Sequence, residues 1–222
     1  MNLDSKMISL LIQGIWETVY MVFFSSTISY LIGIPLGIIL VVTDKNGIKP
    51  IPTINAVFGV VINILRSVPF IILLIMVMPV TKFVVGTTLG PKAVVVPLVI
   101  AAAPYIARMV ESSMKEVDAG VIEAAKSMGA STLQIIYKVL LPESKPSLLV
   151  GAAISVTTIL GYTAMAGFVG GGGLGTIAIN YGYYRYQTNI MLITVAILVI
   201  IVQIIQEFGM KMSSISDKRI RS

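Results

Sequence analysis

The stretch EAAKSMGASTLQIIYKVLLPES, residues 123–144, is a polar helical segment inside a very hydrophobic chain. A short helix is predicted to begin just before this stretch, after Asp118, because a short acidic side chain is a preferred N-cap. Gly129 stands where the left-handed C-cap residue of this helix is expected. The sequence therefore predicts a well-formed polar helix with defined ends.

A second short helix is predicted to follow directly. Ser131 and Gln134 have the spacing of a capping box, and Pro142 is expected to end the helix because an interior proline loses a hydrogen bond and clashes. Each helix carries an apolar stripe, which either folds against the ends of the chain's own membrane spans or docks into a groove on a soluble partner. The stripes consist of Val121, Ile122, Ala124, Ala125 and Met128 on the first helix, and of Ile135, Ile136, Val139 and Leu140 on the second.

The surrounding sequence is that of an integral membrane protein. Of its 222 residues, 56% are hydrophobic and 12% are charged, whereas a soluble domain carries about 25% charged residues. A helix of about 20 apolar residues crosses the bilayer core. Gly33 and Gly37 in the first apolar stretch form a G-x-x-x-G pair that permits close helix contact. We expect an all-α integral membrane domain, a single domain over residues 1–222, with five transmembrane helices at about 18–43, 54–78, 87–107, 148–169 and 188–206.

Charge predicts the orientation of these spans, since lysine and arginine gather in cytoplasmic loops. An odd number of spans places the two termini on opposite sides of the membrane. If the loop 43–53, the segment 108–147 and the C-terminal tail are inside, they hold 11 of the 16 lysines and arginines. The chain is therefore predicted to lie in the cell membrane (inner or plasma membrane) as a multi-pass protein, with the N-terminus outside and the C-terminus cytoplasmic. Residues Met7 to Trp16 are expected along the outer interface.

Residue types exclude several kinds of chemistry. The chain has no cysteine and no histidine, which removes thiolate nucleophiles, imidazole metal ligands and His-based triads. In GGGGLGT, residues 170–176, Thr176 stands where a Walker A motif needs lysine, and no strand precedes the glycines, so a turn or re-entrant element is expected. The net charge of +6 is typical of cytoplasmic loops rather than of nucleic-acid binding. We expect no cofactor, no metal, no nucleic acid and no catalytic residues.

The spacing of Glu123-Ala124-Ala125, Gly129 and Val139-x-Leu141-Pro142 resembles the EAA loop of ABC importer permeases (E-A-A-x3-G-x9-I-x-L-P). The one departure is Val139 where isoleucine is usual. The resemblance implies a type I ABC importer transmembrane domain over residues 13–207, with a cytoplasmic coupling loop at 111–146 whose helices insert into a cleft on separate ATPase subunits. The residues that it implies for ATPase coupling are Glu123, Ala124, Ala125, Gly129, Val139, Leu141 and Pro142.

Two further segments resemble the permease subunit of methionine importers: NILRSVPFIILLIMVMP in the second span and GFVGGGGLGTIAINYGYYRY after the fourth. This resemblance implies a transport subunit, not an enzyme, that moves a small amino acid such as methionine inward by alternating access. The partners that it implies are two ABC ATPase subunits, a second copy of the chain and an extracytoplasmic substrate-binding protein. Two alternatives are a permease for another small solute and an ATP-independent secondary transporter, which would need ionisable residues inside the membrane.

Arg66 is the one charge deep in a predicted span. Since arginine at the bilayer centre costs about 2.5–3.5 kcal/mol, it must face protein or water. It either bonds backbone carbonyls, helped by a kink at Pro69, or takes part in the translocation pathway or gate. The resemblance makes the fourth span a lining of the central path, with Tyr162 and Thr163 on it and Met165 as a soft hydrophobic plug.

Overall fold

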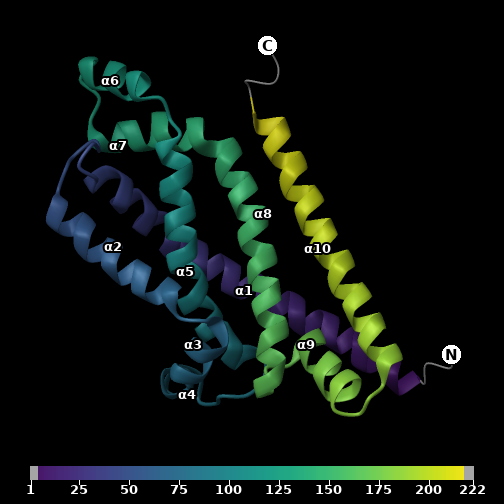
Figure 1. Ribbon diagram of the computed structural model, residues 1–222. Coiled ribbons are helices and arrows are strands. Elements are labelled where there is room, and N and C mark those ends of the chain that lie inside the picture. The colour runs from purple at the N-terminus through teal and green to yellow at the C-terminus, as the bar shows by residue number, and fades with distance from the viewer. Residues whose placement is uncertain (1–4, 218–222) are drawn as a thin grey trace. The chain divides into compact units, whose positions relative to one another are not determined.

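The structure is a computed structural model that describes residues 5–217 (Figure 1). This part of the chain consists of helices joined by short connections and contains no β-strand. The elements run in the order α1 (Ser5–Thr43), α2 (Pro52–Ser67), α3 (Phe70–Met76), α4 (Met78–Val85), α5 (Pro91–Lys115), α6 (Ala119–Ser127), α7 (Thr132–Ile135), η1 (Ile136–Leu140), α8 (Leu141–Ala166), η2 (Gly167–Val169), α9 (Gly173–Ile177), η3 (Ala178–Tyr183) and α10 (Thr188–Ser216).

Four helical segments of the described chain are long and apolar enough to cross a membrane: α1, α5, the continuous helix Thr132–Val169, and α10. The pair α2 and α3, separated by a short break, is a fifth candidate if the two helices count as one span. The predicted all-α class is therefore confirmed, with four or five candidate spans.

The helices extend beyond the predicted spans. α1 begins at Ser5, so Met7 to Trp16 belongs to the same helix as the first predicted span. α5 begins at Pro91, so the predicted start of the third span at residue 87 is wrong; residues 87–90 are not helical, and Gly90 has a φ of 86°. α5 continues past residue 107 to Lys115, and α10 continues past residue 206 to Ser216. The difference arises because hydropathy marks only the turns that suit hydrocarbon, whereas the helical hydrogen bonds continue through polar turns on either side.

Proline interrupts the second predicted span. α2 ends at Ser67 and α3 begins at Phe70, with Pro69 between them in an extended conformation (φ −57°, ψ 137°). Proline lacks an N–H and its ring clashes with the carbonyl four residues back, so the helix cannot pass through it. The kink expected at Pro69 is confirmed, and it is a complete break between two helices.

The chain forms two compact units, each assembled from three segments. Among the described residues, unit 1 comprises 5–28, Val68–Ala102 and Val156–Ile205, and unit 2 comprises Ser29–Ser67, Ala103–Ser155 and 206–217. The four long helices α1, α5, α8 and α10 contribute residues to both units. The units are therefore not successive stretches of chain joined by a linker.

In unit 1, the segment that follows α8 folds back onto α1. The N–H of Gly173 donates to Glu17 Oε2 at 2.7 Å, which fixes the start of α9 against α1. An apolar cluster holds the same contact from the other side and consists of Leu11, Leu174 and Ile177.

The glycine-rich segment 170–176 forms a tight turn, as expected, followed by the short helix α9. Gly170, Gly172 and Gly173 have φ of 74°, 82° and 72°. Glycine adopts this left-handed region without the steric cost that other residues carry. The glycines are therefore explained by backbone geometry.

In unit 2, small residues of α1 let α5 approach closely. A Cβ on Gly33 would lie 2.6 Å from Ile106 Cγ2, and a Cβ on Gly37 would lie 2.6 Å from Val110 Cβ. The close helix contact predicted from the G-x-x-x-G pair is confirmed. The buried cluster beside it joins α1, α2 and α5 and consists of Leu40, Ile62 and Ala107.

Candidate functional site

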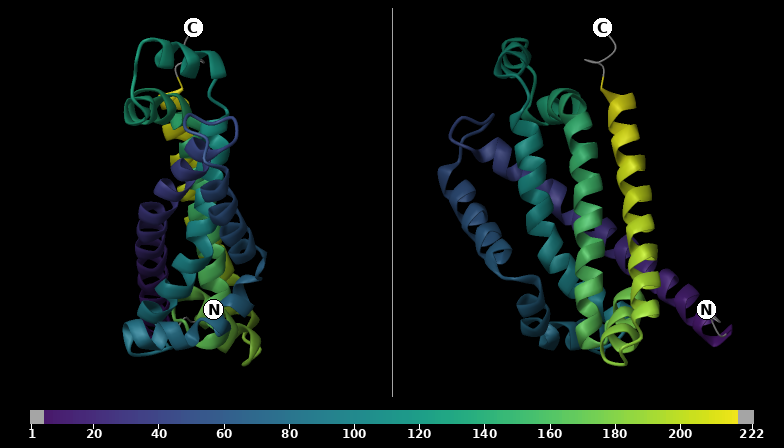
Figure 2. Two further views of the ribbon diagram at one scale, coloured as in Figure 1. Left: turned by 90° about the vertical axis from the view of Figure 1, so that its left-hand side faces the viewer. Right: turned by 45° about the vertical axis from the view of Figure 1, so that its right-hand side comes forward.

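The predicted pair of short helices is present in unit 2, where α6 and α7 lie side by side (Figure 2). The carboxylate of Asp118 accepts a hydrogen bond from the Gly120 N–H at 2.8 Å and caps the start of α6. At the start of α7, the Ser131 N–H donates to Gln134 Oε1 at 2.8 Å and the Gln134 N–H donates to Ser131 Oγ at 3.4 Å. Both predicted N-caps are confirmed, including the reciprocal capping box.

Gly129 ends α6 in the left-handed conformation, with φ of 79°. Its N–H donates to the Lys126 carbonyl at 2.9 Å, and the Ala130 N–H donates to the Ala125 carbonyl at 3.1 Å. These two bonds form a Schellman motif, which satisfies carbonyls that the last turn of a helix leaves free. The predicted left-handed C-cap is confirmed, and the turn between α6 and α7 has one defined geometry.

Pro142 does not end the second helix, and that prediction is wrong. Residues Ile136–Leu140 form a π-helical turn, after which α8 continues from Leu141 through Pro142. The Leu141 N–H donates to the carbonyl of Ile136, five residues back. This wider turn shifts the hydrogen-bond register just before Pro142, which stands at the start of α8, where proline is tolerated, and the helix continues.

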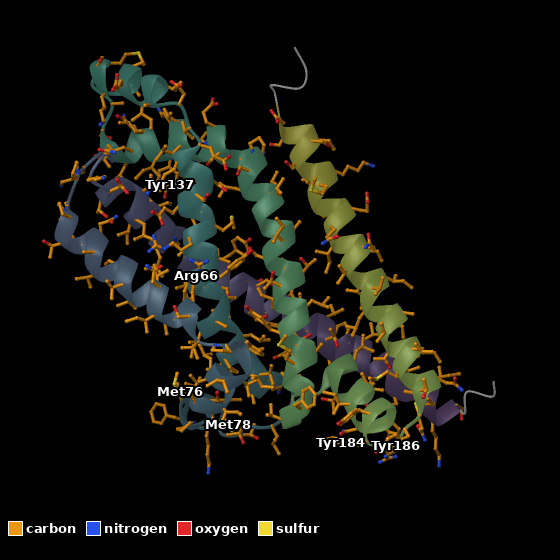
Figure 3. All side chains as sticks on the ribbon, viewed as in Figure 1. Arg66, Met76, Met78, Tyr137, Tyr184 and Tyr186 are labelled. Carbon is orange, nitrogen blue, oxygen red and sulfur yellow. The ribbon has the colours of Figure 1, made fainter. Side chains whose placement is uncertain are left out.

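The two apolar stripes have different surroundings. Ile135, Ile136 and Leu140 are buried, so the stripe on the second helix packs against the chain itself. On α6 only Ala125 is buried, and Met128 is 82% exposed. Apolar side chains also remain exposed on the outer side of both helices, namely Val121, Leu133 and Tyr137, the last labelled in Figure 3. Internal packing therefore accounts for one stripe and leaves an apolar surface on the other helix.

The residues of the EAA-type motif divide in the same way. Ala125 is buried, and Val139 and Leu141 are half-buried beside the π-helical turn. The remaining members are exposed: Glu123, Ala124, Gly129 and Pro142. Beneath α6 lies a cavity of about 430 Å³, lined by Ile122 of α6, by Met114 of α5 and by the segment that follows α1. α6 therefore has one buried residue, Ala125, and a hollow beneath Ile122.

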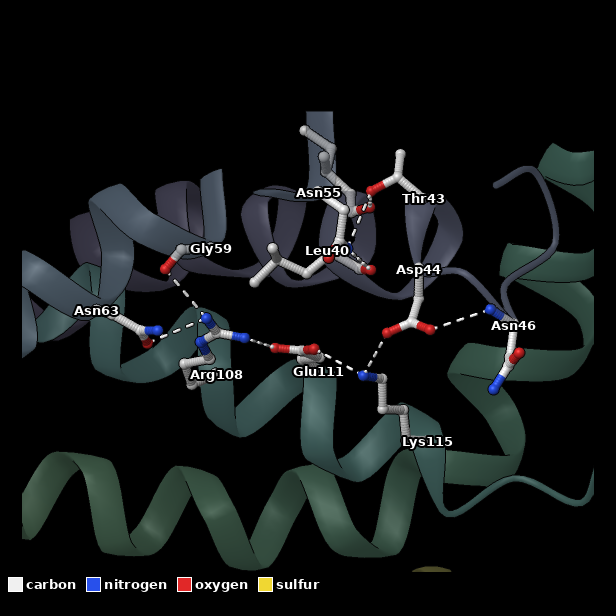
Figure 4. Close-up of polar contacts among 11 residues, drawn as sticks. Leu40, Thr43, Asp44, Asn46, Asn55, Gly59, Asn63, Arg108, Glu111 and Lys115 are labelled. Carbon is white, nitrogen blue, oxygen red and sulfur yellow. Dashed lines mark hydrogen bonds and ion pairs between the residues drawn. The ribbon is translucent and has the colours of Figure 1, made fainter. Parts of the chain in front are cut away.

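Two carboxylates and two cations alternate near the ends of α1 and α5 (Figure 4). Glu111, which is buried, accepts from Arg108 Nη1 at 2.7 Å and from Lys115 Nζ at 2.9 Å. Lys115 Nζ also donates to Asp44 Oδ2 at 2.8 Å. The Lys115 ammonium, through this hydrogen bond, holds the pKa of the Asp44 carboxyl below its usual value. We call Asp44, Arg108, Glu111 and Lys115 the Glu111 network.

The network also reaches α2. Arg108 Nη2 donates to the Gly59 carbonyl at 3.1 Å and to Asn63 Oδ1 at 3.0 Å. The sequence interpretation missed this arrangement, which ties three helices together. The sequence does contain a signal for these ion pairs. Arg108, Glu111 and Lys115 stand three and four residues apart, which is the spacing of ion pairs on one face of a helix.

Arg66 lies in the last turn of α2 and is exposed (Figure 3). Within residues 5–217 it makes no hydrogen bond or ion pair with another residue. The interpretation that backbone carbonyls hold this guanidinium therefore finds no support in the structure, and the side chain is available to groups outside the described chain.

The other predicted pathway residues belong to unit 1. Phe70, which follows Pro69, stacks on Tyr162 with ring centroids 4.4 Å apart and planes within 7°. Thr163 is buried and its hydroxyl donates to the carbonyl three residues back at 2.7 Å. Met165 is 47% exposed. The structure thus brings Tyr162 to the break at Pro69, while the hydroxyl of Thr163 bonds its own helix.

An all-helical domain with four or five candidate spans and two capped short helices between α5 and α8 has the architecture of a type I ABC importer permease. A solved inward-facing structure of the MetNI methionine ABC transporter, in a native crystal form, has this fold. That chain superposes with a TM-score of 0.96 at 42% sequence identity, covering 97% of this chain and 100% of its own. The chain belongs to the family of binding-protein-dependent transport system inner membrane components, whose model matches residues 33–221. It is a permease subunit of an ABC importer.

Relatives with similar sequences carry related names. The probable D-methionine transport system permease protein MetI of Vibrio cholerae is 50% identical over 200 residues, which cover 90% of this chain and 89% of that protein. The methionine import system permease protein MetP of Bacillus subtilis is 46% identical over 181 residues, 82% of each chain. A solved amino acid ABC transporter with histidines, 20% identical with a TM-score of 0.79, shares the fold.

Proposed function

We propose that this permease subunit carries methionine inward across the cell membrane. The observation that carries the proposal is the similarity to methionine permeases along nearly the whole chain, at 50% identity to the Vibrio cholerae protein over 200 residues. The test is uptake of radiolabelled methionine by proteoliposomes that contain the permease, its ATPase and its binding protein. Uptake that requires ATP and is competed by unlabelled methionine, but not by other small amino acids, supports the proposal. If an unrelated amino acid competes equally well, the proposal is wrong and the substrate is another small solute.

We further propose that α6 and the α7–η1 helix are the coupling helices that insert into the ATPase subunits. Support comes from exposed apolar side chains on a rigidly capped helix pair, a surface that needs a partner. In this assignment Glu123, Ala124 and Gly129 lie on the inserted surface, while Ala125, Val139, Leu141 and Pro142 fix the path of the chain from this surface into α8. Glu123→Lys and Gly129→Asp should each abolish ATPase attachment and uptake. Normal attachment and uptake in both variants would refute the coupling role.

The proposed assembly contains two copies of the chain, two ATPase subunits and an extracytoplasmic binding protein, with the N-terminus outside and the C-terminus in the cytoplasm. The charge distribution supports this orientation. The absence of cysteine from the sequence makes the orientation easy to test. Lys126→Cys and Lys82→Cys both replace exposed residues. A membrane-impermeant maleimide should label Lys82→Cys in intact cells and Lys126→Cys only after lysis, and the reverse pattern would overturn the orientation.

We also propose that the translocation pathway or its gate includes five residues: Arg66, Pro69, Tyr162, Thr163 and Met165. Support comes from Arg66, which is exposed and has no ion-pair partner within residues 5–217, and from the Phe70–Tyr162 stack at the helix break. Arg66→Leu should abolish uptake while the ATPase still binds, and uptake at the wild-type rate would exclude Arg66 from the pathway. Labelling of Met165→Cys should change when nucleotide is added, and constant labelling would exclude a gating role.

A further inference from the structure

The Glu111 network lies directly behind the first coupling helix. Lys115 is the last residue of α5, and α6 begins four residues later at Ala119. Lys115 is bonded both to Glu111 on its own helix and to Asp44 just after α1. A displacement of α6 therefore reaches this lysine through a very short connection.

α6 contacts α7 and η1, and a cavity separates it from the end of α5. Ala125 is the one residue of α6 that is buried, and the half-buried Ile122 lines the cavity of about 430 Å³ beneath the helix. The cavity wall includes Asp44 and Lys115 themselves. The N-terminal end of α6 therefore leads directly to the network, through the short connection between Lys115 and Ala119.

The network fastens three helices at this point. Glu111 holds Arg108 and Lys115 on α5, Arg108 holds the Gly59 carbonyl and Asn63 on α2, and Lys115 holds Asp44 after α1. The two carboxylates and two cations balance in charge. Removing Glu111 alone would leave two cations facing each other around a buried site, which is far costlier than an exposed pair.

We propose that the Glu111 network is a mechanical clamp that makes the ends of α1, α2 and α5 move together with the first coupling helix. Glu111, Arg108 and Lys115 are thus positioning residues for ATP-driven transport. The inference rests on the proposed coupling role of α6. Its consequence is that a broken clamp lets the ATPase close and hydrolyse ATP while α1 and α2 do not follow.

The experiment measures methionine uptake and ATP hydrolysis in the same proteoliposomes, made with the intact complex of permease, ATPase and binding protein. Lys115→Met removes the link to Asp44, and Lys115→Arg keeps a cation at that position. For Lys115→Met we expect an intact complex with hydrolysis near the wild-type rate but uptake per ATP reduced about tenfold, within the range of ordinary coupling energies. Lys115→Arg should keep most of the wild-type ratio of uptake to ATP hydrolysis. If Lys115 had only a structural role, Lys115→Met would lower methionine uptake and ATP hydrolysis together.

Glu111→Gln provides the second arm, with Glu207→Gln as the matched control because Glu207 is an exposed carboxylate on α10 with no ion pair among the described residues. Glu111→Gln should lower uptake per ATP at least as far as Lys115→Met, and Glu207→Gln should leave it unchanged. Wild-type ratios in both Lys115→Met and Glu111→Gln would overturn the clamp. Should Glu111→Gln fail to assemble, the half-exposed Lys115 still decides the question. Failure of the wild-type complex to assemble or to pump would instead refute the proposed function.

Discussion

Gly129 offers a quantitative test of the coupling loop. Its φ of 79° lies in the left-handed region, and a Cβ built on it meets no atom within 4 Å. Replacement by alanine therefore adds no clash and changes only the backbone energy, by about 1–2 kcal/mol. If the Schellman turn must be formed when the ATPase binds, this cost weakens binding by about 5- to 30-fold, since 1.4 kcal/mol corresponds to a factor of ten.

The assay is a titration of the ATPase subunit onto permease held in nanodiscs. Gly129→Ala should raise the dissociation constant by about 5- to 30-fold. Gly129→Asn should raise it less, because asparagine tolerates the left-handed region better than other residues with side chains. Nucleotide concentration and lipid composition are kept constant, because both shift apparent affinity through mass action or charge.

Gly86 provides the matched control. It ends α4 with φ of 82°, and a Cβ there also meets no atom within 4 Å. Gly86→Ala carries the same backbone cost but lies in unit 1, outside the coupling helices, so it should leave ATPase affinity unchanged. The reasoning is refuted if Gly129→Ala binds within twofold of wild type, or if Gly86→Ala weakens binding equally.

Three further predictions follow from other parts of the fold. Ser131→Ala removes one half of the capping box at a cost of about 1 kcal/mol, so the same titration should show roughly fivefold weaker ATPase binding; unchanged affinity would mean that the box is dispensable. Gly37→Val places a side chain 2.6 Å from its neighbour on α5 and should destabilise the folded permease by about 1–3 kcal/mol in thermal unfolding, whereas Gly161→Ala, with no atom within 4 Å, should not. Lys115 lowers the pKa of Asp44 from 3.8, so this pair stabilises the folded state above about pH 4 and loses that contribution as the pH falls through the lowered pKa. The difference in Tm between wild type and Asp44→Asn should be constant from pH 5 to 8 and shrink at lower pH; a difference that shrinks on raising the pH from 5 to 8 would contradict the assignment.

The caps of the coupling loop could be predicted because their causes are local. Asp118, Gly129, Ser131 and Gln134 each act on backbone groups within a few residues, so sequence spacing determines the geometry. The break at Pro69 was predictable for the same reason. In each case one residue type permits or forbids one hydrogen bond.

Features that depend on contacts between residues far apart in the sequence could not be predicted from local spacing. The spacing of Arg108, Glu111 and Lys115 on one helix face is visible in the sequence, but the partners Asp44 and Asn63 come from segments more than forty residues away. Hydropathy assigned residues 108–115 to a loop, whereas they complete α5. The continuation of α8 through Pro142 was missed because a shift of hydrogen-bond register leaves no mark in residue type.

The π-helical turn at Ile136–Leu140 has a consequence for how this segment can change over generations. A π turn holds one more residue than an α turn, so deletion of a single residue there would restore a regular helix. Such a deletion would leave the preceding segment in nearly the same orientation, because the wider turn already absorbs the extra residue. In a regular stretch of α8 the same deletion would rotate everything before it by about 100° about the helix axis, since an α-helix has 3.6 residues per turn. Loss of one residue within this π turn would therefore keep the surface of α6 and α7 aimed in nearly the same direction, whereas loss of one residue elsewhere in α8 would turn that surface away.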